Sequence, residues 1–104
     1  MNTTTVSSGE QIAHHETLNV KVRYAASGKP YVNPKANPDE TLAALKQQVL
    51  QFFGLVEGEV DGGRKVYFLT YGGVQQTDLS IQLKQLAQGE HHLELNLIEQ
   101  FIQG

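Results

Sequence analysis

Hydrophobic and polar residues alternate in two stretches of the chain, a pattern typical of half-buried β-strands. The first stretch covers residues 18–24 and the second covers residues 93–97. Residues 65–71 form a third β-rich run, which ends at a Gly-Gly pair that predicts a hairpin turn. Residues 31–33 predict a short return strand after a turn at Gly28. Because Pro34 and Pro38 cannot donate ladder hydrogen bonds, we expect this strand to lie at an edge or to end early.

One stretch repeats its hydrophobic residues at helical spacing. Leu42, Leu45, Val49 and Phe53 fall on one face, and polar residues fill the other. Residues 37–41 carry the turn, acidic and capping residues that open a helix, and Gly54 is a typical stop. Residues 81–86 predict a short second helical turn. We expect residues 56–64, which are rich in glycine and acids, to form a mobile loop.

The element order is strand, strand, helix, strand, short helix, strand. One helix must then cover one face of a small sheet, because each amphipathic face needs a partner. The last strand can pair in parallel with the first at the centre of the sheet. This predicts an α+β fold of the β-grasp type, a roll in which a mixed four- to five-stranded sheet packs on one helix. Residues 17–97 form the predicted domain, between a flexible tail of residues 1–16 and a C-terminal tail of residues 98–104.

Composition narrows the class of protein. The chain has 104 residues, a net charge of -3 and no cysteine, so a single domain without disulfides or thiolate metal sites is expected. Without a basic run, nucleic-acid binding has little electrostatic support. The chain lacks an apolar run of about 20 residues and a signal peptide, so we expect no membrane contact and a cytoplasmic location.

Three stretches resemble ubiquitin and the ubiquitin-like proteins, including those encoded beside conjugation enzymes in bacteria. Residues 27–29 match the family's Thr-Gly-Lys turn, and residues 37–42 match its Glu-Pro-Ser-Asp-Thr-Ile helix entry. Residues 79–95 resemble the segment that closes the family's fold. The likeness covers about residues 18–97, in order and at similar spacing.

The resemblance implies a protein modifier, which is not itself an enzyme and needs no cofactor of its own. Its C-terminal glycine carboxylate, here that of Gly104, is adenylated by an activating enzyme that uses ATP and magnesium. The acyl group then passes as a thioester to a conjugating enzyme and joins an amine on a target protein. Glycine leaves the carboxyl carbon unhindered. The stalk that enters these enzymes would comprise Ile98, Glu99, Gln100, Phe101, Ile102 and Gln103. A processing peptidase is a further expected partner, and the protein itself is expected to be a monomer.

Some residues depart from the family. Ubiquitin's tail ends in Gly-Gly and carries arginines, whereas this tail has a single final glycine, so a dedicated activating enzyme is expected. Leu69 lies near the family's central apolar surface position, with Ala26 and Asn96 as more polar companions. Two alternatives remain: a β-grasp subunit that docks non-covalently in a larger complex, and a sulfur carrier.

Other candidate sites have simpler interpretations. The pairs at residues 14–15 and 91–92 are adjacent histidines, which point to opposite faces of a strand and chelate poorly, so no metal site is predicted. No pattern typical of a catalytic triad or carboxylate pair occurs. Acceptor lysines for chain formation could be any of Lys21, Lys29, Lys35, Lys46, Lys65 and Lys84.

Overall fold

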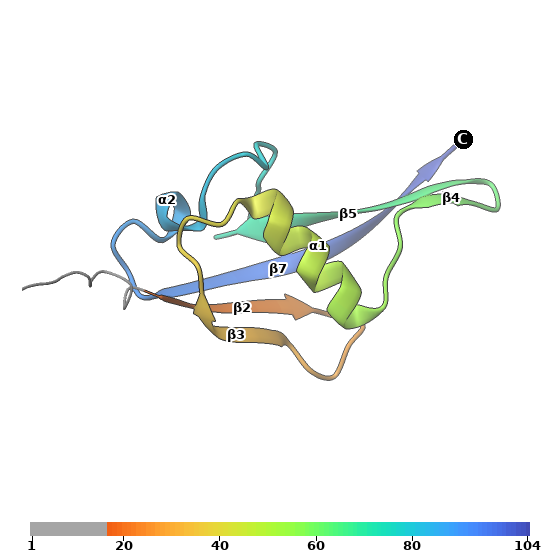
Figure 1. The fold of residues 1–104 in the computed structure, drawn as a ribbon. Helices are drawn as coiled ribbons and strands as arrows, with labels where there is room; N and C mark the ends of the chain where they lie inside the picture. The colour runs from red at the N-terminus through yellow and green to blue at the C-terminus, as the bar shows by residue number, and fades with distance from the viewer. Residues whose placement is uncertain (1–16) are drawn as a thin grey trace, which may run out of the picture.

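The computed structural model describes residues 17–104, so the predicted tail and the His14–His15 pair lie outside the described residues. The strands are β2 (Leu18–Tyr24), β3 (Tyr31–Ala36), β4 (Gly58–Val60), β5 (Gly63–Tyr71), β6 (Val74–Gln75) and β7 (His92–Gln103). The helices are α1 (Leu42–Phe53) and α2 (Leu83–Ala87). The strands form one sheet in the order β3-β2-β7-β5-β4, and β6 pairs with β5. Helix α1 lies across one face of this sheet (Figure 1).

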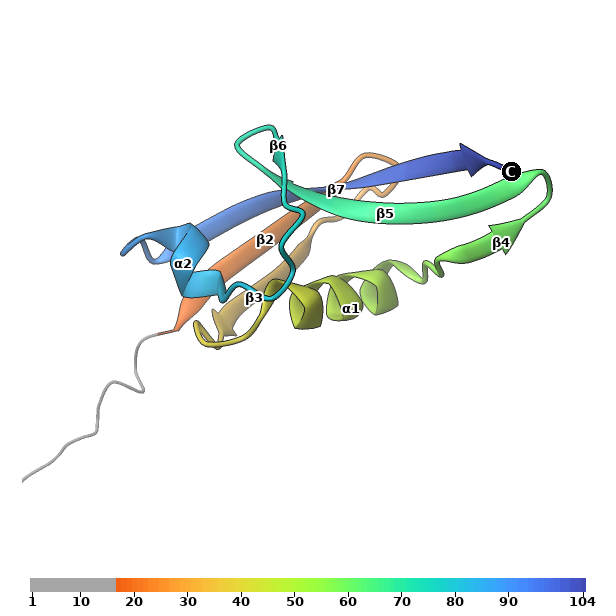
Figure 2. The same ribbon diagram turned by 90° about the horizontal axis from the view of Figure 1, so that it is seen from above.

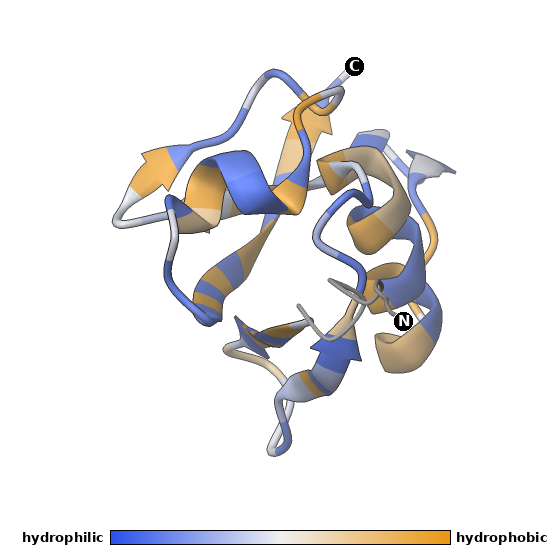
Figure 3. Ribbon diagram, turned by 60° about the vertical axis from the view of Figure 1, so that its left-hand side comes forward, coloured by the Kyte–Doolittle hydropathy of each residue, from blue (hydrophilic) through white to orange (hydrophobic). Residues whose placement is uncertain are grey.

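The centre of the sheet is the parallel pair of β2 and β7, as the sequence predicts. Val20 lies opposite Leu93, and Val22 lies opposite Leu95. All other strand pairs are antiparallel. Hydrophobic and polar residues alternate along the strands (Figure 3). The resulting apolar face meets the buried stripe of α1, formed by Leu42, Leu45 and Val49. The α+β prediction is therefore confirmed.

Helix α1 begins and ends at the residues that the sequence indicates. The Thr41 hydroxyl accepts a hydrogen bond from the Ala44 N–H at 3.2 Å, which satisfies one free donor of the first turn. Gly54 adopts a left-handed conformation with φ of 70°, and its N–H reaches the last carbonyls of the helix. The predicted turn after β5 is also present, since Gly72 and Gly73 both have positive φ.

Strand β3 is longer than the sequence suggests. It runs past Pro34 to Ala36, with a register shift against β2 between Leu18 and Val20. The proline is tolerated because β3 is an edge strand and needs no donor on its outer side.

The largest difference lies at the C-terminal end of the chain. The sequence pattern predicts that the last strand ends at Leu97, but β7 continues to Gln103. Its second half pairs with β5 in regular register, from Ile98 opposite Phe68 to Gln103 opposite Gly63. The predicted loop of residues 56–64 also contains β4, which pairs with the start of β5. These segments project beyond the end of α1 (Figure 2). We name residues 58–68 and 98–104 the arm.

Candidate functional site

Gly104 lies at the exposed tip of the arm. Its N–H donates a hydrogen bond to the Gly62 carbonyl at 3.0 Å, which continues the β5–β7 ladder by one residue. Residues 98–103, expected as a tail beyond the last strand, are therefore a paired strand, and the prediction that the strand ends at Leu97 is wrong. The ladder explains why, because β5 supplies partners for backbone groups that would otherwise stay in water.

The tip of the arm depends on a close backbone approach. A Cβ atom added to Gly63 would lie 2.1 Å from the Ile102 carbonyl oxygen and 2.9 Å from the Phe101 ring. Only glycine fits there, and the ring of Phe101 covers the surface that a side chain would otherwise occupy. A Cβ atom at Gly104 would instead meet the Gly63 Cα atom at 3.4 Å, an ordinary contact. Gly63 is thus needed for the packing of the arm, whereas Gly104 is not.

A carboxylate fastens the base of the arm to the rest of the domain. The Tyr24 and Tyr67 hydroxyls both donate to the same oxygen of Glu99, at 2.9 and 3.1 Å. The ring of Tyr24 packs on Phe53 at the end of α1, with centroids 5.3 Å apart. The Lys65 ammonium lies 3.9 Å from the second Glu99 oxygen. We name Tyr24, Tyr67 and Glu99 the carboxylate clamp.

The clamp shifts the pKa of each of its groups. The hydrogen bond from Tyr24 and then that from Tyr67 lower the pKa of Glu99, so it stays ionised. Burial, followed by the Glu99 carboxylate, raises the pKa of both tyrosines, so they stay protonated as donors. The three protonation states that the clamp needs are therefore all favoured near neutral pH.

A second carboxylate caps the outer edge of β5 next to the start of β4. The Tyr67 N–H donates to Glu57 at 2.7 Å, and the Lys46 ammonium on α1 lies 3.0 Å from the same oxygen. Burial raises the pKa of Glu57, but the Tyr67 N–H and Lys46 outweigh it, so the net pKa is lowered. Lys46 is thereby held in place with a side chain only 17% exposed, which makes it a poor acceptor for chain formation.

The residues that the sequence predicts for partner binding differ in their exposure to solvent. Leu69 has no exposed surface and faces Leu97 inside the core, so it cannot belong to a binding patch, and this part of the prediction is wrong. The six residues of the predicted stalk are all exposed on the arm. Ile98 and Ile102, each 39% exposed, lie on the face away from α1, opposite Phe68 and Arg64, respectively. This outer apolar face was missed because β5 and β7 must be paired before the two isoleucines share a surface with Phe68.

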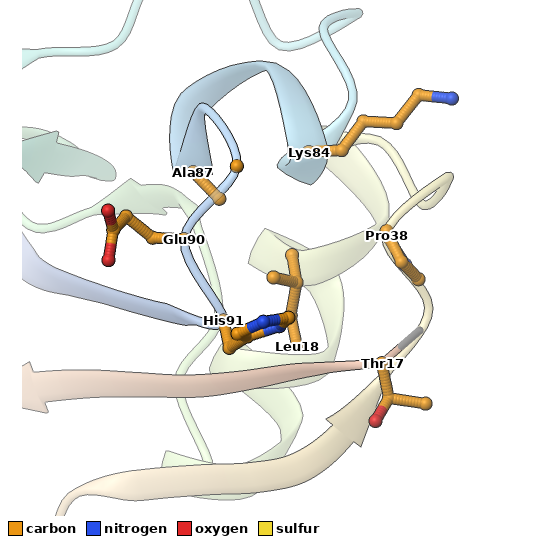
Figure 4. Close-up of a pocket in the computed structure, with 8 residues that line it drawn as sticks. Thr17, Leu18, Pro38, Lys84, Ala87, Glu90 and His91 are labelled. Atoms are coloured by element: carbon orange, nitrogen blue, oxygen red, sulfur yellow. The ribbon is translucent and has the colours of Figure 1, made fainter. Parts of the chain in front are cut away.

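The other end of the domain lies around the start of β2 and helix α2. A shallow hollow there is lined by Leu18, Pro38, Ala87 and His91, among others, and the Lys84 side chain extends away from it (Figure 4). Lys84 instead pairs with Asp39 at 2.8 Å. Within residues 17–104, no three His, Asp or Glu side chains gather closely enough to hold a metal ion. No helix in this part of the chain is long and apolar enough to cross a membrane.

Comparison with solved structures identifies the fold. Ubiquitin from Caldiarchaeum subterraneum superposes with a TM-score of 0.60 over 84% of this chain and 98% of its own, at 22% identity. The chain therefore has a ubiquitin-like β-grasp fold. The ubiquitin-like domain of yeast Ddi1 gives a TM-score of 0.58 at 13% identity, over 86% of this chain and 95% of that domain. A ubiquitin-like domain of an Arabidopsis thaliana protein gives 0.54 at 18% identity, over 86% and 89% of the two chains.

No family model matches the sequence, and no curated protein matches it either. Each of these solved neighbours is described as a ubiquitin or a ubiquitin-like domain, and at identities of 13–22% the likeness shows the fold.

Proposed function

We propose that this chain is a ubiquitin-like protein modifier whose acyl donor is the Gly104 carboxylate. The observation that carries the proposal is the position of Gly104, exposed at the tip of an arm that projects from a ubiquitin-like fold. A carboxylate placed there can reach a partner's active site while the body of the domain stays outside. The glycine adds no Cβ beside the reacting carbon.

The proposed chemistry takes place in four steps on partner enzymes. The Gly104 carboxylate attacks the α-phosphorus of ATP on an activating enzyme, and pyrophosphate leaves. A thiolate then attacks the carbonyl carbon of the acyl adenylate, and AMP leaves. A thiolate of the conjugating enzyme next attacks this thioester carbon, and the first thiolate leaves. Finally, a target amine attacks the new thioester carbon, and the second thiolate leaves. This chain supplies the carboxylate and the surfaces that position it.

The paired state of the tail adds a step before this chemistry. A narrow channel admits a single extended strand, so residues 98–104 would have to separate from β5 before they enter one. Separation breaks the β5–β7 ladder of the arm and the contacts of the carboxylate clamp. The clamp therefore sets how readily the acyl donor becomes available.

Reconstitution with a candidate activating enzyme tests the proposal. The protein, the enzyme, ATP and magnesium are mixed, and adducts are separated on gels with and without reductant. We expect a reductant-sensitive adduct that is lost when Gly104 is deleted. Gly28→Ala, in the open β2–β3 turn, is a matched control, because no atom lies within 4 Å of the added Cβ. An adduct that persists after the deletion, or none with any adenylating enzyme tested, would reject the modifier.

The pairing of the tail also favours a second candidate, a non-covalent interaction subunit. In that function the arm is a fixed binding element, and Ile98 and Ile102 contact a partner from its outer face. Deleting Gly104 alone separates the two functions. The deletion abolishes transfer by a modifier but leaves Ile98 and Ile102 on the arm, so binding by a non-covalent subunit is retained.

A further inference from the structure

The backbone groups along the outer edge of β5 are largely satisfied. Strand β4 pairs with residues 63–65, the Glu57 carboxylate accepts from the Tyr67 N–H, and the Gln76 N–H donates to the Leu69 carbonyl at 2.9 Å. A strand edge covered in this way offers little to another chain. The only long edge left on the arm is therefore on the other side, along β7.

Two hydrogen bonds fix which backbone groups of β7 face that side. The Gly104 N–H points to Gly62 on the β5 side, and the His91 carbonyl accepts from the Asn19 N–H on the β2 side. Since successive residues of a strand point their N–H and C=O groups to opposite edges, the odd-numbered residues of β7 face the β2 side. Strand β2 ends at Tyr24, opposite Leu97. Beyond that point, Glu99, Phe101 and Gln103 face an edge along which no strand of residues 17–104 lies.

This open edge differs from the two outer edges of the sheet. Strand β3 carries Pro34 and a register shift, and β4 has only three residues. Both are features that prevent strand pairing between molecules. The open half of β7 has no proline and keeps a regular register with β5 throughout. Its side chains include Phe101 and Ile102, which are 48% and 39% exposed, and its only charge is on Glu99.

We propose that the open edge of β7 pairs with the same edge of a second copy of this chain, in antiparallel orientation. The two-fold axis passes through Phe101, so that the two Phe101 residues face each other and Glu99 faces Gln103 of the second copy. All three outward-facing residues of each copy then have partners, in about six hydrogen bonds across the interface. A dimer departs from the monomer expected from the sequence. The inference goes beyond the proposed function and does not depend on it.

The side chains of one copy complement those of the other in this register. The Gln103 amide can donate to the Glu99 carboxylate of the second copy, and no two like charges face each other. The Phe101 rings meet at the axis as a cross-strand aromatic pair. An identical pair of edges satisfies the two-fold symmetry of a closed dimer. Because the arm projects beyond α1, the two domain bodies would lie toward opposite ends of the joined arms (Figure 2).

Charge substitutions at Gln103 test both the dimer and its register. Gln103 faces Gly63 within its own chain, so a change of side chain leaves the β5 pairing intact. In the dimer, Gln103→Lys places a cation opposite each Glu99, and Gln103→Glu places an anion there. By analytical ultracentrifugation, we expect the lysine variant to lower the dimer dissociation constant and the glutamate variant to raise it, each by about 2- to 30-fold for two cross-strand pairs.

A cysteine at the axis gives an independent measurement. The native chain has no cysteine, and facing residues of a hydrogen-bonded antiparallel pair have Cα atoms about 5.5 Å apart, within disulfide range. Mild oxidation of Phe101→Cys should therefore give a covalent dimer much faster than that of Val56→Cys, a control at an 82% exposed site. A protein that stays monomeric up to millimolar concentration would overturn the proposal. A dimer dissociation constant that changes in the same direction in both Gln103 variants, or in neither, would also overturn it. Equal rates of crosslinking for Phe101→Cys and Val56→Cys would do the same.

Discussion

Tyr24 and Glu99 are 75 positions apart in sequence, yet the tyrosine hydroxyl donates a 2.9 Å hydrogen bond to the carboxylate. This contact joins the end of β2 to the part of β7 that has already passed beyond β2. The C-terminal strand is therefore held in two ways, by its ladder with β5 and by a side-chain contact to the body of the domain. Both restraints lie outside the core, so each can be weakened without lowering the stability of the domain.

Glu99→Gln should loosen the arm without unfolding the domain. The amide keeps the size of the side chain but removes the charge that both tyrosine hydroxyls contact. We expect faster amide hydrogen exchange in residues 98–104 and unchanged exchange in the core strands. Glu94→Gln is the matched control, because Glu94 lies on the same strand and pairs at the surface with Arg23 at 2.6 Å. Equal exchange in the two variants would contradict a role of the clamp.

The arm should also loosen in acid. The hydrogen bonds from Tyr24 and Tyr67 lower the pKa of Glu99 below its ordinary value of 4.5. The clamp's contribution is then complete above pH 4.5, declines as the pH falls below 4.5 and is lost below the lowered pKa. Exchange rates in residues 98–104, corrected for intrinsic pH dependence, should rise over this range. In Glu99→Gln this rise in exchange rate with falling pH should be absent. A rise that persists in this variant would assign the transition to another group.

Gly63→Ala should separate the tip of the arm. The new methyl group would collide with the Ile102 carbonyl, 2.1 Å away, so the strands must move apart. Overpacking of this kind costs about 1–3 kcal/mol where the structure cannot relax, and less where a strand end can peel away. We expect loss of the Gly104–Gly62 hydrogen bond and of protection at residues 102–104. Gly28→Ala, whose added Cβ atom meets no atom within 4 Å, should leave amide hydrogen exchange in the arm unchanged.

Substitutions in the core should lower the free energy of global unfolding, whereas substitutions in the arm should raise only local exchange rates. Leu95 is fully buried between α1 and the sheet, so Leu95→Ala should lower the free energy of global unfolding by about 2–5 kcal/mol. Phe101 is 48% exposed at the far end of the arm, so Phe101→Ala should leave global unfolding in urea nearly unchanged. Its effect should appear only as faster local exchange in the arm. A similar loss of global stability in both variants would show that the arm and the core unfold as one unit.

The sequence predicted those elements whose pattern is local. The alternation from Leu18 to Tyr24, the spacing of Leu42, Leu45 and Val49, and the stop at Gly54 all correspond to observed elements. The parallel pairing of the first and last strands also followed, because one helix can cover only a few sheet arrangements.

The arm could not be predicted in the same way. The arm forms only when residues 98–103 pair with residues 63–68, and neither segment buries a continuous apolar face. Two signals were nevertheless present. No glycine or proline interrupts residues 93–103, and Asp61-Gly62 is a hairpin turn signal between two short segments that contain valine. Leu69 was misassigned for a related reason, since the face that a strand residue occupies is known only once the register is fixed.

The position of β7 has a mechanical consequence. A load attached at Gly104 would pull along β7, which pairs with β5 over its second half and with β2 over its first. Such a force acts parallel to both neighbouring strands and is shared among many ladder hydrogen bonds at once, so it shears the strands instead of unzipping them one bond at a time. The end of the chain that would be joined to a target is thus also the end of the strand at the centre of the sheet.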